Sequence, residues 1–177
     1  AARAQKEPAN LAQHQVDGIA KAIADACAAQ SERLAKMAVE ETGFGIWQDK
    51  VLKNLLGSAI TWDSVKDMKT VGIIKDDRQN GLMEVGVPMG VVAALIPSTN
   101  PTSTTMYKSI ISIKAGNAIV ISPHPNAKNC IIETAKVICE AARKAGAPEG
   151  IVQCITLPTM EATDALLKNR NIGIILA

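Results

Sequence analysis

Residues 90–104 read GVVAALIPSTNPTST. The apolar run 90–96 predicts a buried strand, and the polar turn Pro97-Ser98-Thr99-Asn100 leads from it into a helical pattern over residues 101–115. Asn100 is a favoured N-cap residue, and Pro101 suits the first position of a helix. A buried strand that passes through a short turn into a helix is the repeating unit of α/β folds.

The same unit recurs further along the chain. The strand pattern 118–121 ends in Ser122-Pro123-His124-Pro125, and a helical pattern follows over residues 126–145. Near-continuous apolar strands joined by helices indicate an α/β fold with a Rossmann-like parallel sheet and helices on both of its faces. Two strand ends that open onto helix N-termini are a common way for such a sheet to hold an anionic ligand. The remaining elements expected in this half are strands at 151–155 and 172–176 and a helix at 159–168.

Helical periodicity fills the first part of the chain. The patterns 9–29, 31–41 and 47–67 predict a layer of packed helices without a chemical motif. Ser31 is the expected N-cap of the second of these helices. Gly57 lies inside the third helix, where glycine costs about 1 kcal/mol relative to alanine, so close packing is expected at that point.

A two-stranded ribbon is predicted between the helical layer and the sheet. Apolar stretches at 70–74 and 82–87 are separated by a polar loop that ends in the turn dipeptide Asn80-Gly81. Such a ribbon is marginally stable alone, so we expect it to rest on another surface, for example that of a partner subunit.

Composition narrows the class of protein. The chain has 177 residues, of which 47% are hydrophobic, and its 19 basic and 17 acidic residues give a net charge of +2. It should therefore fold around a real core. The charges are well mixed and only 2% of residues are aromatic, which argues against nucleic-acid or membrane-surface binding. With no signal peptide and no apolar run of membrane-spanning length, a soluble cytoplasmic protein is expected.

No metal site is predicted. None of the four cysteines belongs to a C-x-x-C pair, and neither histidine stands in a metal-ligand pattern. The cysteines fall inside helix or strand patterns, so we expect small buried hydrophobes in a reducing compartment. The residues concerned are Cys27, Cys130, Cys139, Cys154, His14 and His124.

The residues alone leave two interpretations of each polar turn. Standard phosphate fingerprints are absent, since Gly43-x-Gly45 follows a helix and no G-x-x-x-x-G-K-[ST] occurs. The turn 97–100 either binds a ribose, an amide or a developing oxyanion, or merely caps the helix. The turn 122–125 either borders a ligand or is a rigid connection with His124 at the surface. No Asp or Glu follows the second strand to hold a ribose 2′-hydroxyl, so an extra phosphate on the ribose is not excluded.

These turns resemble those of the CoA-acylating aldehyde dehydrogenases, a branch of the aldehyde dehydrogenase superfamily. The T-N-P-T-S-T and S-P-H-P pair is typical of this branch, whereas ordinary members have Trp-Asn or Phe-Asn and then Lys-Pro at these places. The resemblance covers almost the whole chain in family order. The matching segments are 38–43, 69–74, 97–104, 114–119, 122–125 and 145–148.

The resemblance implies an oxidoreductase that interconverts an aldehyde and its acyl-CoA. NAD, or alternatively NADP, would take the hydride, and CoA would remove the acyl group from a cysteine thioester. Thr99 and Asn100 would lie in the oxyanion turn, with the donor left open between them. Pro97 and Ser98 would line the nicotinamide side. An adenosine pocket used in turn by NAD and coenzyme A would be bordered by Ser122, Pro123, His124 and Pro125.

The resemblance also implies parts that this sequence lacks. The family's nucleophilic cysteine belongs to a separate catalytic domain, and none of the four cysteines matches its motif. Residues 1–177 are therefore expected to be the N-terminal cofactor-binding segment of a longer bacterial enzyme. The ribbon at 70–87 would belong to an arm that forms a homodimer or a larger homo-oligomer, in the cytoplasm or in a bacterial microcompartment.

Two alternatives to this function stay open. The first is a non-acylating semialdehyde dehydrogenase that releases a free acid. The second is a non-catalytic nucleotide-binding or assembly module that ends near Ala177. The aldehyde itself is not identified by these residues.

Overall fold

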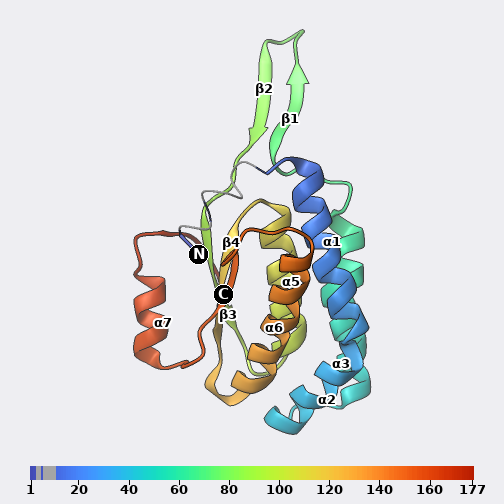
Figure 1. Cartoon of the computed structure of the whole chain (residues 1–177), viewed down its shortest axis with the longest axis vertical. Coiled ribbons are helices and arrows are strands. Elements are labelled where there is room, and N and C mark those ends of the chain that lie inside the picture. The colour runs from blue at the N-terminus through green and yellow to red at the C-terminus, as the bar shows by residue number, and fades with distance from the viewer. Residues whose placement is uncertain (3–4, 6–10) are drawn as a thin grey trace.

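The computed structural model describes residues 1–2, 5 and 11–177. In this part of the chain a parallel sheet lies beside a block of helices, and a two-stranded ribbon projects away from both (Figure 1). The helices are α1 Gln13–Ala29, α2 Ser31–Thr42, α3 Trp47–Leu55, α4 Thr61–Val65, α5 Pro101–Lys114, α6 Lys128–Lys144 and α7 Met160–Leu167. The strands are β1 Gly72–Asp77, β2 Leu82–Gly86, β3 Val91–Ile96, β4 Ala118–Pro123, β5 Val152–Cys154 and β6 Ile172–Leu176.

The predicted parallel sheet is confirmed. Its strand order is β5-β4-β3-β6, and each neighbouring pair runs parallel. The central strands β3 and β4 are almost entirely buried, as their apolar runs predict. β4 is two residues longer than expected and ends at Pro123, whereas β5 is shorter than the predicted strand 151–155.

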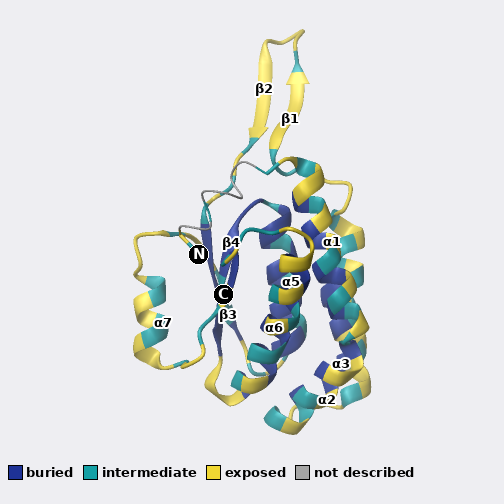
Figure 2. Ribbon diagram, in the orientation of Figure 1, coloured by how far each residue is buried: buried dark blue, intermediate teal, exposed yellow. Residues whose placement is uncertain are grey.

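Helices lie on both sides of the sheet. Figure 1 shows α5 and α6 together on one side, with α1 and α3 outside them, and α7 on the opposite side. Burial follows this layering: the central strands and the inner faces of α5 and α6 are buried, while the ribbon is largely exposed (Figure 2). The predicted arrangement of the sheet and its covering helices is therefore confirmed.

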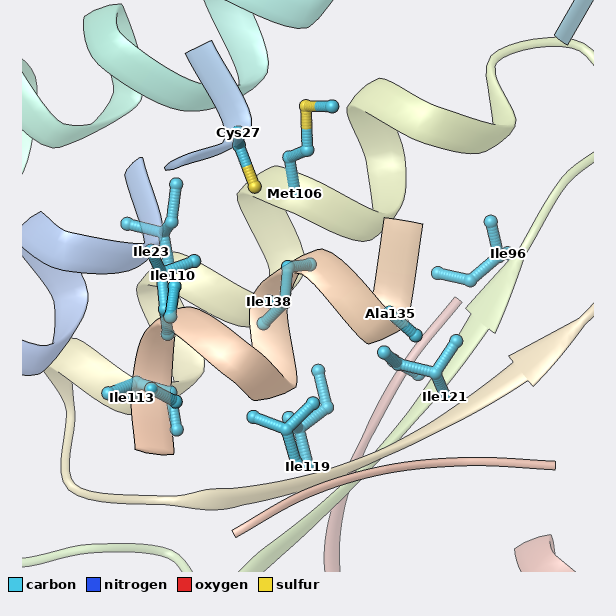
Figure 3. Close-up of a cluster of buried hydrophobic side chains, with 14 of the residues drawn as sticks. Ile23, Cys27, Ile96, Met106, Ile110, Ile113, Ile119, Ile121, Ala135 and Ile138 are labelled. Carbon is cyan, nitrogen blue, oxygen red and sulfur yellow. The ribbon is translucent and has the colours of Figure 1, made fainter. Parts of the chain in front are cut away.

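The core forms between the sheet and the helical block. Ile23 of α1, Met106 and Ile110 of α5, Ile138 of α6 and Ile121 of β4 converge there and are fully buried (Figure 3). Each such side chain contributes about 1.5–3 kcal/mol when removed from water. This cluster fixes the helices against β3 and β4, whose ends carry the polar turns.

The ends of the first two helices differ slightly from expectation. α1 begins at Gln13, and positions 9 and 10 of the predicted helix lie outside the described residues. The N-cap of α2 is Gln30, so the prediction of Ser31 as the N-cap is wrong by one residue. Ser31 instead begins the helix, and its backbone oxygen accepts a hydrogen bond from Nδ2 of Asn54 (2.9 Å). α2 ends at Thr42, one residue beyond the predicted pattern, and its C-cap is Gly43, whose φ of 69° favours glycine.

The expected close packing at Gly57 is confirmed. The predicted helix 47–67 is observed as an unbroken helical segment over residues 47–65, in which Leu56–Ile60 form a π-helical turn between α3 and α4. A Cβ on Gly57 would lie 2.6 Å from the backbone oxygen of Ser103 in α5. Glycine therefore lets the backbones of the two helices touch, which brings the end of α3 close to the start of α5.

Candidate functional site

The two polar turns lie side by side. Ile96 and Pro123 are register partners at the ends of β3 and β4. The backbone N–H of His124 donates to the backbone oxygen of Ile96 (3.1 Å), which extends the strand pairing by one step. The structure therefore brings the turn 97–100 and the turn 122–125 together at one edge of the sheet, as expected for parallel strands.

Asn100 precedes α5 but does not cap it with its side chain. Its backbone oxygen accepts a hydrogen bond from the N–H of Thr104 (3.2 Å), as at a helix start, yet the side chain makes no capping bond. Oδ1 accepts instead from the ammonium of Lys53 (3.0 Å). The interpretation in which the Asn100 amide serves only as a cap is therefore not supported by its contacts.

Thr99 is held through its backbone. Its carbonyl oxygen accepts a hydrogen bond from Nζ of Lys50 (2.8 Å), while the residue itself is exposed. Lys50 is only 5% exposed, and burial, followed by the nearby charge of Lys53, lowers its pKa. Two lysines of α3 thus converge on the turn, so the expectation that the first helices only pack has to be revised.

A small pocket lies against this turn. It encloses about 200 Å³ between the loop that follows α2, the start of α3 and the end of the turn. Cationic groups and amide or hydroxyl groups on its wall suit a ligand atom that carries partial negative charge. The lining residues are Phe44, Gly45, Ile46, Asp49, Lys50, Lys53, Thr99 and Asn100.

The second turn divides into a buried and an exposed part. Ser122 is 3% exposed, and its Oγ lies 3.1 Å from Oγ1 of Thr163 in α7. Pro123 is also buried, whereas His124 and Pro125 are exposed. Nδ1 of His124 accepts a hydrogen bond from the N–H of Asn126 (3.1 Å), which fixes the ring on the turn. Ser122 therefore ties β4 to α7, and His124 and Pro125 present the accessible surface.

The N-terminus of α6 is already occupied by a side chain. The Glu41 carboxylate, at the end of α2, accepts hydrogen bonds from the N–H groups of Asn129 (2.8 Å) and Cys130 (2.6 Å). A carboxylate in this position satisfies free N–H groups and favours the positive end of the helix dipole. The N–H groups of Asn129 and Cys130 are therefore engaged by Glu41 and are not available to a ligand anion. Glu41 lies in the matching segment 38–43, but its partners are 88 and 89 positions away, so no local pattern indicates this contact.

Lys108 is another contact that the sequence did not reveal. This residue of α5 is 2% exposed, and Nζ donates to the backbone oxygens of Leu95 (2.8 Å) and Leu176 (3.0 Å). Burial lowers the pKa of its ammonium. Lys108 thereby links the ends of the adjacent strands β3 and β6 beneath the turn.

The four thiols are poorly suited to nucleophilic attack. Cys27 and Cys130 are buried, as predicted, while Cys139 and Cys154 are half-buried. Burial raises the pKa of all four thiols, to about 12 for Cys27 and Cys154. A nucleophile needs a thiolate, which a raised pKa disfavours at neutral pH.

The residues that the structure describes offer neither a metal-binding cluster nor a membrane-spanning helix. They contain no group of three or more His, Cys, Asp or Glu side chains that could hold a metal ion. None of the helices among these same residues is long and apolar enough to span a membrane.

The chain is similar to known proteins along almost its whole length. The bifunctional aldehyde-alcohol dehydrogenase of Escherichia coli K12 is 43% identical over 99% of this chain, which spans 20% of that relative's length. The crystal structure of an acetylating aldehyde dehydrogenase from Geobacillus thermoglucosidasius is 50% identical with a TM-score of 0.98, covering 100% of this chain and 39% of that one. A propionaldehyde dehydrogenase structure from Rhodopseudomonas palustris, with bound CoA and an acylated cysteine, is 28% identical with a TM-score of 0.80, covering 99% and 40%.

The chain thus spans less than half the length of each of these proteins. Residues 1–177 match the model of the Aldehyde dehydrogenase family over their whole length. The fold of the whole chain closely matches that of the solved acetylating enzyme, as its TM-score of 0.98 shows. On these grounds the chain belongs to the aldehyde dehydrogenase family.

Proposed function

We propose that this chain is the cofactor-binding part of an NAD-dependent, CoA-acylating aldehyde dehydrogenase. The observation that carries the proposal is the Thr99-Asn100 turn, which lies next to the end of β4 and presents an amide that is not used as a helix cap. The similarity to an acetylating enzyme favours the acylating reaction over a non-acylating semialdehyde dehydrogenase. The same similarity to enzymes argues against a non-catalytic module.

Asn100 is proposed as the oxyanion donor. When a thiolate attacks an aldehyde, the carbonyl oxygen gains negative charge, and a preorganised N–H group stabilises it. Oδ1 of Asn100 is engaged by Lys53, so Nδ2 is the end of the amide that is left to donate. The Thr99 hydroxyl is the second candidate, but the contact that holds Thr99 is made by its backbone oxygen.

The adenosine pocket is proposed at the second turn. His124 and Pro125 would contact the ligand from their exposed positions, while the buried Ser122 and Pro123 shape the end of the strand. The turn 122–125 itself contains no Asp or Glu that would select a ribose 2′-hydroxyl over a phosphate, which suits CoA and leaves NADP as the alternative dinucleotide. Bound NAD would supply the hydride acceptor. Pro97 and Ser98 would lie on the nicotinamide side, next to the proposed donor.

We propose that the nucleophile is a cysteine other than the four described above. Their pKa values are raised by burial, and none lies in the pocket beside Thr99. The acyl group would pass from an aldehyde to this other cysteine as a thioester and then to the CoA thiol. This chain would bind and orient the cofactors and polarise the carbonyl oxygen.

The ribbon is proposed as an oligomer contact. Its two strands expose apolar side chains that a stable solvent-facing hairpin would not normally display. A second subunit of the same protein would cover them in a homodimer or larger homo-oligomer. The exposed residues are Ile73, Ile74, Leu82, Met83 and Val85.

The proposed reaction is tested with the intact protein, acetaldehyde, NAD and CoA. We expect acetyl-CoA and NADH to appear in equal amounts, and NADH formation to stop when CoA is left out. Release of free acetate at the same rate without CoA would contradict the acylating reaction. Replacement of NAD by NADP in the same assay decides between the two dinucleotides.

A further inference from the structure

Two lysines on one face of α3 donate hydrogen bonds to the two residues of the proposed oxyanion turn, Thr99 and Asn100. Lys50 and Lys53 are three residues apart, so their side chains leave the helix in similar directions. Nζ of Lys50 donates to the backbone oxygen of Thr99 (2.8 Å), and Nζ of Lys53 donates to Oδ1 of Asn100 (3.0 Å). Both lysines line the pocket of about 200 Å³ in front of the turn.

The Lys50 contact fixes the peptide between Thr99 and Asn100. This peptide group is planar and trans, so its N–H points away from the carbonyl oxygen that Lys50 binds. Lys50 is 5% exposed, and its ammonium therefore has little freedom to release the carbonyl. Consequently the backbone from which the Asn100 side chain projects is held in one orientation.

The Lys53 contact fixes and polarises the amide itself. Because Oδ1 is the acceptor end of the amide, engaging it leaves the NH₂ end to donate to a ligand. Among the described residues, Nδ2 of Asn100 has no hydrogen-bond partner. A cation bound to the oxygen of an amide draws electrons from its nitrogen, and such chains of hydrogen bonds strengthen one another. Nδ2 therefore becomes a better donor as well as a better placed one.

We infer that Lys53 is a positioning residue for the reaction, which directs and polarises the Asn100 amide toward the oxyanion. This inference rests on the proposed role of Asn100 in the preceding section. Lys53 acts through the asparagine, and the reacting carbonyl oxygen receives its hydrogen bond from Nδ2. Lys50 is buried, so its hydrogen bond contributes to the stability of the folded protein. Lys53 is exposed, and its hydrogen bond contributes little to stability.

Substitution Lys53→Met in the intact enzyme separates positioning from folding. Methionine keeps an unbranched side chain but removes both the charge and the donor. We expect kcat with acetaldehyde, NAD and CoA to fall about tenfold, because a misplaced catalytic group costs one to two orders of magnitude. KM for the aldehyde and the unfolding midpoint should stay near their original values. Lys53→Arg, which can still donate to Oδ1, should retain most of the activity.

The control lysine is Lys21 of α1, which forms an exposed ion pair with Asp25 (2.5 Å) and does not line the pocket. Lys21→Met removes the same chemical groups and should leave kcat unchanged. The decisive comparison introduces Lys53→Met into the Asn100→Ala background. If Lys53 acts through the asparagine, kcat should not fall further in the double variant.

The outcomes distinguish this inference from the proposed function. An enzyme in which Asn100→Ala lowers kcat and Lys53→Met does not would overturn the lysine inference alone. The same holds if the two effects multiply in the double variant, since Lys53 would then act independently of the asparagine. A natural enzyme that forms no acyl-CoA from any aldehyde would overturn the proposed reaction, and one whose kcat is unchanged by Asn100→Ala would overturn the proposed role of Asn100. Either result would overturn this inference as well.

Discussion

Glu41 and Cys130 are joined by a 2.6 Å hydrogen bond from the Cys130 N–H to the Glu41 carboxylate, across 89 positions of the chain. The other carboxylate oxygen accepts from the N–H of Asn129 (2.8 Å), so one side chain caps the first turn of α6. The contact anchors α2 to the helix that follows β4. It also removes the N–H groups at the start of α6 from those that could bind a cofactor phosphate, so the proposed adenosine contacts would come from the exposed turn before this helix.

Glu41→Gln should destabilise the protein by about 1 kcal/mol, because the amide loses the charge and one of the two acceptors. Glu40→Gln is the matched control, since Glu40 is adjacent and exposed and should change stability by less than about 0.5 kcal/mol. Chemical denaturation of the intact protein measures both. Equal effects of the two substitutions would contradict the capping role.

Asp17→Asn should cost about 3 kcal/mol, because Lys114 would remain buried without a compensating charge. Its ammonium lies 2.5 Å from Asp17, and the Lys114 side chain is only 2% exposed. The exposed pair Lys21–Asp25 on the same helix provides the control, and Asp25→Asn should cost less than about 1 kcal/mol. Equal shifts of the denaturation midpoint in Asp17→Asn and Asp25→Asn would show that the cost does not depend on the burial of Lys114.

Gly57→Ala should destabilise the protein by about 1–3 kcal/mol through overpacking. The added Cβ would lie 2.6 Å from the backbone oxygen of Ser103, and backbone cannot move aside easily. Gly18→Ala in α1 meets nothing within 4 Å and should instead stabilise by about 1 kcal/mol. Thermal unfolding of the two variants should therefore move in opposite directions, and a shared direction would contradict the contact between the helices.

Stability should fall as the pH rises above 9. Burial raises the pKa of Cys27 from 9.0 to about 12, so between these values the unfolded chain releases a proton that the folded chain keeps. Under that condition the free energy of unfolding decreases with increasing pH. Cys27→Ala removes the ionisable thiol and should give a shallower decrease in urea titrations between pH 8 and 10. An unchanged slope would show that Cys27 does not contribute.

Local patterns were sufficient for the sheet and its turns. The apolar runs of β3 and β4 and the proline at the start of α5 predicted a strand, a turn and a helix within a few residues of the observed bounds. Each of these signals is carried by neighbours in the sequence. The π-helical turn at Leu56–Ile60 was not predicted. Gly57 indicated a close contact at this point, but a glycine does not indicate that the hydrogen-bonding pattern of the helix changes there.

The contacts of the site could be predicted less well. Thr99 and Asn100 stood out because polar residues follow a buried strand. Lys53 did not stand out, since a lysine on an exposed helix face is ordinary and its partner lies 47 positions away. The role of Glu41 could not be predicted for the same reason, although its carboxylate caps the N-terminus of α6. Pairing between distant elements is set by the tertiary fold, and a single sequence gives no measure of it.

The central claim is that the Asn100 amide stabilises the oxyanion, and single-turnover kinetics of Asn100→Ala in the intact enzyme test it most directly. The account predicts that the acylation rate falls about 10²-fold, as on removal of one oxyanion donor. Stability should change by less than about 0.5 kcal/mol, because the side chain makes no capping bond. An acylation rate within twofold of the natural enzyme, together with a loss of about 1 kcal/mol in stability, would instead identify Asn100 as a helix cap and contradict the account.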